Sequence, residues 1–217
     1  MNPQIRIIIG LSCMIPAIIG LVKFNRISSK YYPFVFMMIL DVIIEMIDNF
    51  TVVKKFDNIY MVVTFGFFLF FVNTNKYLSK RWLEIFLGSA IAFITLSMIQ
   101  NGVLSALSYY EVCFISVVIL FISIDILTSQ VFSIKSRLVK NFWFWFSIGS
   151  TLMYGYSLLL FGLYFFTLKN TPQGKAIGDI WIFVNLACYT LYTIAILKIP
   201  ETKPSFIFKK RNLINHV

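Results

Sequence analysis

Long apolar stretches alternate with short polar connections along the chain, and this pattern predicts an all-α membrane protein with seven transmembrane helices. A bilayer core of about 30 Å requires about 20 mostly apolar residues per helix. No connection is long enough to form a second domain, so we expect one domain over residues 1–217 with a short basic tail, 198–217. The predicted helices are approximately 5–22, 32–53, 58–73, 82–99, 110–128, 142–167 and 179–197.

Composition favours lipid, rather than water, as the surrounding of most side chains. Hydrophobic residues make up 59% of the chain and charged residues only 13%, and the mean hydropathy is +0.83. Soluble domains have about 25% charged residues. The chain therefore has too little polar surface to cover a globule in water.

Basic residues predict the orientation of the helices. Lysine and arginine gather in the first, third and fifth connections and in the tail, which the positive-inside rule places in the cytoplasm. The N-terminus is then outside and the C-terminus inside. In a soluble protein the net charge of +10 would indicate nucleic acid; beside apolar helices it indicates the lipid bilayer as partner, and no nucleic acid.

Acidic residues form a stripe in the second predicted helix. Asp41, Glu45 and Asp48 are spaced by four and three residues, which puts them within an arc of roughly 60°, and Asn49 follows. An acid in mid-membrane costs roughly 2.5–3.5 kcal/mol, and no helix has a lysine or arginine at that depth. The acids are therefore protonated, bind a cation or cationic ligand, or face a vestibule open to water. In the structural alternative, protonated carboxyls only hydrogen-bond neighbouring helices.

Further polar residues in other helices are candidates to line the same interior, although packing is the commoner role of such groups in membrane helices. No cofactor, metal site or catalytic group is expected, because the only histidine is His216 and the three cysteines lack metal-ligand spacing. The additional candidates for a ligand site are Asp125, Tyr154, Asn185 and Tyr189.

Similar segments open corresponding helices in the two halves of the chain. Residues 30–36 open the second predicted helix and 140–146 the sixth, and both segments begin with lysine and are rich in aromatic residues. Residues 58–60 and 179–181 open the third and seventh. This order suggests a 3+1+3 architecture of two parallel triplets joined by a central helix.

Two short patterns resemble a group of uncharacterised seven-helix bacterial membrane proteins encoded beside sensor histidine kinases. One is Lys-x-x-Pro-Phe at 30–34, followed by an apolar helix with Glu45. The other is Asn-x-x-x-Tyr-x-x-x-x-x-Ala-x-Leu at 185–197, ending in Ile199 and Pro200. The resemblance implies a multi-pass protein of the bacterial cytoplasmic (inner) membrane that belongs to a signalling system, and it transfers no binding residue.

Three functions are compatible with these observations. The first is a sensory or receptor-like module that binds a small ligand or cation through the acidic stripe and signals to a separate cytoplasmic partner, such as a histidine kinase. The second is a small 3+1+3 transporter of a polar or cationic solute. The third is an intramembrane enzyme acting on lipid, with Asp41 and Glu45 as acid and base; without a nucleophile motif or several histidines, we expect the protein not to be an enzyme.

Overall fold

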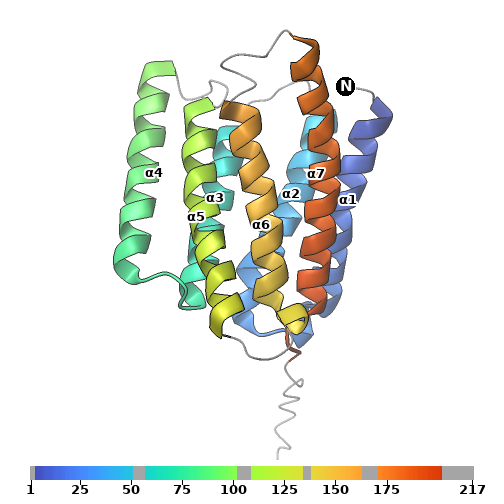
Figure 1. Cartoon of the computed structure of the whole chain (residues 1–217), viewed down its shortest axis with the longest axis vertical. Coiled ribbons are helices and arrows are strands. Elements are labelled where there is room, and N and C mark those ends of the chain that lie inside the picture. The colour runs from blue at the N-terminus through green and yellow to red at the C-terminus, as the bar shows by residue number, and fades with distance from the viewer. Residues whose placement is uncertain (1–2, 51–56, 102–108, 134–137, 163–170, 202–217) are drawn as a thin grey trace, which may run out of the picture.

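The computed structural model describes residues 3–50, 57–101, 109–133, 138–162 and 171–201, and in these ranges it consists of helices joined by short turns, with no strand (Figure 1). Three short 3-10 helices shape the connections: η1 (Phe24–Arg26), η2 (Ser29–Tyr31) and η3 (Leu138–Lys140). The seven α-helices are α1 (Pro3–Lys23), α2 (Tyr32–Phe50), α3 (Asp57–Thr74), α4 (Lys80–Asn101), α5 (Tyr109–Ser133), α6 (Phe142–Leu159) and α7 (Pro172–Leu197).

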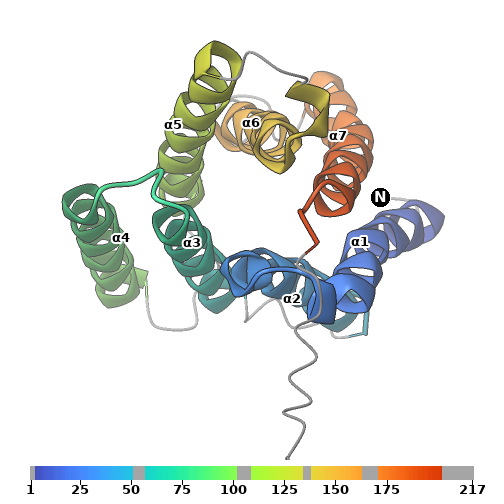
Figure 2. The ribbon, with the colours of Figure 1, turned by 90° about the horizontal axis from the view of Figure 1, so that it is seen from below.

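Six helices form a closed ring, which is visible from the end of the bundle (Figure 2). Its order is α1, α2, α3, α5, α6 and α7, and α7 packs against α1 to close it. The pairs α5–α6 and α6–α7 are the most extensively packed, whereas α3 and α5 touch only sparsely. Helix α4 lies outside the ring and contacts α3 and α5.

One end of the bundle is basic. Helices α1, α3, α5 and α7 end there, and α2, α4 and α6 begin there (Figure 1). We call it the basic end, because the connections that meet at it carry most of the described basic residues: Lys23, Arg26, Lys30, Lys76, Lys80, Arg81, Lys140 and Lys198.

The predicted helices are all present, with differences at their ends. Helix α5 continues to Ser133, five residues beyond its predicted end at 128. Helix α7 begins at Pro172, seven residues before its predicted start at 179. Proline is well suited to the first turn of a helix, where its missing N–H costs no hydrogen bond. The predicted ends at 53 and 167 lie outside the described residues.

Three of the described helices are long and apolar enough to cross a membrane. They contain the segments Glu111–Phe132, Phe142–Gly162 and Ile180–Leu197, and Val62–Thr74 is a shorter apolar segment. The acids of the stripe interrupt the run of apolar residues in α2, which is itself a continuous helix. Helix α4 begins with three charged residues, Lys80, Arg81 and Glu84.

Local sequence explains two helix ends at the basic end. Helix α3 stops in a Schellman turn, in which the N–H of Tyr77 donates to the Val72 carbonyl over 3.1 Å and that of Lys76 to Asn73 over 2.8 Å. Lys76 holds the left-handed position with φ 64°, where glycine is more usual. Helix α6 starts with Asn141 as N-cap, whose side chain accepts from the Trp143 N–H over 3.0 Å.

Two glycines allow neighbouring helices to approach closely. A Cβ at Gly20 of α1 would lie 2.9 Å from Cγ1 of Val35 on α2, and a Cβ at Gly149 of α6 would lie 2.9 Å from Cε1 of Tyr192 on α7. Contacts this short do not occur in real structures, so the small residue sets the helix separation.

The Gly149→Ala substitution should therefore destabilise the protein. It pushes on the Tyr192 ring, and overpacking of this kind costs typically 1–3 kcal/mol. Gly88→Ala on exposed α4 is the matched control, since nothing lies within 4 Å of its added Cβ, and alanine is the better helix former by roughly 0.5–1 kcal/mol. Thermal unfolding in detergent should show a lower midpoint for the first variant only. Equal midpoints would contradict the close approach of α6 and α7.

Candidate ligand-binding site

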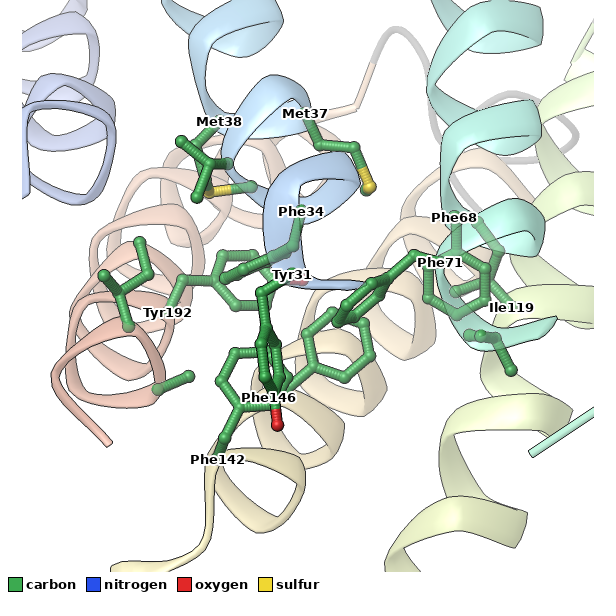
Figure 3. Close-up of a cluster of buried hydrophobic side chains, with 14 of the residues drawn as sticks. Tyr31, Phe34, Met37, Met38, Phe68, Phe71, Ile119, Phe142, Phe146 and Tyr192 are labelled. Carbon is green, nitrogen blue, oxygen red and sulfur yellow. The ribbon is translucent and has the colours of Figure 1, made fainter. Parts of the chain in front are cut away.

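Aromatic side chains fill the interior of the ring near the basic end (Figure 3). At their centre is Phe34 of α2, which has no exposed surface. Its ring centroid lies 5.7 Å from that of Phe71 on α3, and 5.4 and 5.2 Å from those of Phe142 and Phe146 on α6. Tyr31 completes this group, with its ring 5.0 Å from Phe142. We call Tyr31, Phe34, Phe71, Phe142 and Phe146 the aromatic plug.

A polar cluster lies two helical turns farther from the basic end. Asp41 is seven residues after Phe34 on α2, a rise of about 10 Å, and only 9% of it is exposed. Glu45, one turn beyond, is half-buried. Asp41 lies within electrostatic range of Cys13 on α1, Tyr154 on α6, and Tyr189 and Tyr192 on α7. Glu45 reaches Cys13 and Tyr189 in the same way. These six residues are the polar cluster.

Tyr192 connects the polar cluster to the plug. Its ring centroid is 5.7 Å from that of Phe34. Its hydroxyl is hydrogen-bonded to that of Ser150 on α6, with the two oxygens 3.2 Å apart. Gly149, beside Ser150, provides the space for this ring. The aromatic ring of Tyr192, on α7, is therefore held against both α2 and α6.

Five predicted site residues are buried or half-buried in the interior of the ring. Asp41 lies within electrostatic range of Tyr154 and Tyr189, and Glu45 is on the next turn of α2. Asn185 is buried and lies one turn from Tyr189 on the same face of α7. The side chains of the other two α2 candidates, Asp48 and Asn49, lie outside the described part of the structure.

Asp125 does not join the polar cluster. Its side chain is exposed, whereas Ile122, Ser123 and Ile126 on the same helix are buried. At 100° per residue, Asp125 falls on the outward face of α5. The expectation that it lines the interior is therefore wrong, because the helical phase of α5 turns it away.

Sequence reasoning missed two members of the polar cluster. Cys13 was considered only as a possible metal ligand; it is buried and lies within electrostatic range of both acids. Tyr192 was not singled out, although its spacing of three residues from Tyr189 puts the two on one helix face, with ring centroids 6.4 Å apart. This spacing in the sequence could have identified Tyr192 as a neighbour of Tyr189 in the cluster.

Polar side chains join three helices beside the plug at the basic end. The amide nitrogen of Gln130 on α5 donates to the Tyr77 hydroxyl over 2.8 Å, and the Asn141 amide donates to the Gln130 carbonyl oxygen. The Tyr77 ring also packs 4.5 Å from that of Trp143. Burial raises the pKa of the Tyr77 phenol, so it remains neutral and accepts the hydrogen bond from Gln130.

Two further pairs of neighbouring helices in the ring are also tied at this end. Nζ of Lys23, at the end of α1, lies 3.3 Å from Oε1 of Glu201 and donates to the Leu197 carbonyl of α7 over 3.4 Å. Ile27 and Glu201 form an antiparallel bridge. Between α3 and η2, the Asn75 amide donates to the Lys30 carbonyl over 3.3 Å. Lys23 and Glu201 form the clasp, a contact that the sequence pattern did not reveal.

The polar cluster is chemically suited to a small cation. Two carboxyls supply negative charge, and the surrounding tyrosines supply ring faces and hydroxyl oxygens, both of which attract cations. Among the described residues, no group of three or more histidine, cysteine or acidic side chains is arranged to hold a metal ion.

Comparison with known proteins gives no relative: no family model, curated protein or solved structure matches the chain significantly. The resemblance to proteins encoded beside histidine kinases stays a prediction.

Two serines of α6 test whether the hydrogen bond to Tyr192 stabilises the cluster. Ser150→Ala removes this bond and should cost roughly 0.5–1.5 kcal/mol. Ser147 is its matched control, because it is equally buried and its hydroxyl has no hydrogen-bond partner among the described residues. Ser147→Ala removes an unsatisfied polar group and should be neutral or stabilising. Chemical denaturation of both variants measures the difference; a larger loss for Ser147→Ala would contradict the assignment.

Proposed function

We propose that the protein crosses a bacterial cytoplasmic membrane seven times, with the N-terminus outside and the basic end in the cytoplasm. The apolar composition and the three helices that are long enough to span a bilayer support this. The meeting of the first, third and fifth connections at the basic end also supports it, because basic connections are retained in the cytoplasm.

We infer that the polar cluster binds a small cationic ligand and that the protein acts as a sensory or receptor-like module. The observation that carries this inference is the burial of Asp41 inside the ring, among tyrosines from α6 and α7 and with Glu45 one turn away. Two carboxyls one helical turn apart, with tyrosine rings and hydroxyl oxygens around Asp41, supply the negative charge and the ligand atoms that a small cation would need.

The receptor-like function that we propose includes a separate output protein. The basic end presents a concentration of positive charge to which such a partner could bind. The resemblance noted from residues 30–34 and 185–197 suggests a sensor histidine kinase as that partner.

Transport is the second candidate, and the order of helices around the ring favours it. If the ring is rotated by half a turn, so that each helix moves three places along it, α1, α2 and α3 take the places of α5, α6 and α7 (Figure 2). The helices that exchange places also run in the same direction. Helices α2 and α6 then correspond, and they meet inside the ring through Phe34, Phe142 and Phe146. Two parallel triplets with a ligand site between them are an architecture of known transporters. No observation favours the lipid-acting enzyme.

Ligand binding should be visible as a rise in thermal stability. The purified protein would be heated with sodium, magnesium, tetramethylammonium or putrescine, each at several concentrations. A cation at a hundred times its Kd stabilises the folded state by about 2.7 kcal/mol. We expect Asp41→Asn and Glu45→Gln to abolish that rise, and exposed Asp125→Asn to retain it. If no cation stabilises the protein, and the neutral variants are as stable as wild type, the acids are protonated structural groups.

Transport is separated from sensing by uptake into proteoliposomes. Any cation that stabilises the purified protein would be supplied outside and its accumulation followed over time. A transporter should accumulate it in wild type but not in Asp41→Asn, whereas a receptor should bind it without uptake. Saturable uptake would therefore replace the receptor-like reading.

A further inference from the structure

Polar contacts tie the helices of the ring to one another at the basic end. Each helix of the ring has at least one tie there to a neighbour. Clasp residue Lys23 joins α1 to α7, Asn75 joins α3 to the start of α2, and Gln130 joins α5 to both Tyr77 and Asn141. All these ties are made by residues in a connection, or in the last turn of a helix, at the basic end.

The rings of the plug pack closely against one another and against Tyr192. Phe34 and Tyr192 have ring centroids 5.7 Å apart, and Phe34 and Phe71 are also 5.7 Å apart. Phe71, Phe142 and Phe146 are at most 2% exposed. Rings at these separations are in van der Waals contact. A solute held by Asp41 would have to displace several aromatic rings to reach the basic end.

We propose that the aromatic plug, with the clasp and the Gln130 hydrogen bonds at the same end of the bundle, is a closed gate that denies the polar cluster access from the basic end. The cluster then exchanges ligand only with the opposite side of the membrane in this conformation. The gate regulates the site assigned above, and so the importance of the gate rests on the proposed function. The existence of the gate does not depend on the proposed function, because access to the cluster can be measured without a natural ligand.

The central position of Phe34 makes it the residue on which the gate depends. It contacts plug members from α3 and α6, and Tyr192 of α7. Phe36, two residues later, is a matched control, because its ring is 43% exposed and contacts Phe24 and Phe67 instead. Both substitutions to alanine remove the same number of atoms from α2, but only one opens the axis.

Access is tested with a cysteine reporter and a membrane-impermeant trimethylammonium methanethiosulfonate. The three native cysteines are replaced by alanine, and Glu45→Cys introduces the reporter, half-buried in the polar cluster. Asn25→Cys, exposed in the first connection, is prepared separately and identifies the vesicle side on which the basic end lies. Sealed vesicles of both orientations are then treated with the reagent.

With the plug intact, the Glu45→Cys reporter should react from the side opposite the basic end at least tenfold faster than from the basic end. Adding Phe34→Ala should raise the basic-end rate at least tenfold, and adding Phe36→Ala should not change it. Equal rates from both sides with the plug intact, or no reaction from either side, would overturn the proposal. So would a folded Phe34→Ala protein with an unchanged basic-end rate.

Milder variants keep the test informative if Phe34→Ala fails to fold. Glu201→Gln breaks only the exposed ion pair of the clasp, and Phe34→Leu keeps an apolar side chain of smaller cross-section. Either should raise the basic-end rate, by less than the alanine variant. If no cation stabilises the protein but the reporter still reacts from one side only, the proposed function is rejected and the gate is kept. If a cation stabilises the protein but the reporter reacts equally from both sides, the proposed function is kept and the gate is rejected.

Discussion

The packing of Phe34 against three other helices is the interaction on which the arrangement depends. Helices in a membrane gain nothing from hiding apolar surface from lipid, so close packing must hold them together. Aromatic pairs contribute roughly 0.5–1.5 kcal/mol each beyond their buried area, and Phe34 makes such pairs with α3, α6 and α7. This contact centre fixes where α2 lies, and α2 carries the acids of the site. The position of Asp41 therefore follows from an apolar contact two turns away.

Rigidity and polarity are separated along the axis of the ring. Near the basic end, rings and short hydrogen-bonded ties allow little rearrangement. Farther along, α2 contributes acids where apolar residues would have stabilised the bundle more. A protein that retains costly groups at one level and packs the next level densely has the properties of a binding site on a rigid support.

The sequence was sufficient to predict the helices, because the repeated apolar stretches and basic connections each encode a local property. It also predicted that Asp41 and Tyr189 share an interior, since spacings on single helices identify their faces. It was not sufficient for contacts that depend on how helices rotate against one another. Asp125 was placed inside because α5 is apolar on all sides, so its pattern does not define a buried face. The contact between Lys23 and Glu201 joins residues 178 positions apart, for which no local pattern exists.

The place of α4 outside the ring has a consequence for how such a chain can be connected. Three antiparallel helices leave the chain at the end of the bundle opposite to the one where it started. A second set of three helices with the same directions must begin at the original end, so one more helix is needed to return there. Helix α4 makes that return and packs sparsely against α3 and α5. Fewer neighbours therefore constrain its sequence than constrain the sequence of a helix in the ring.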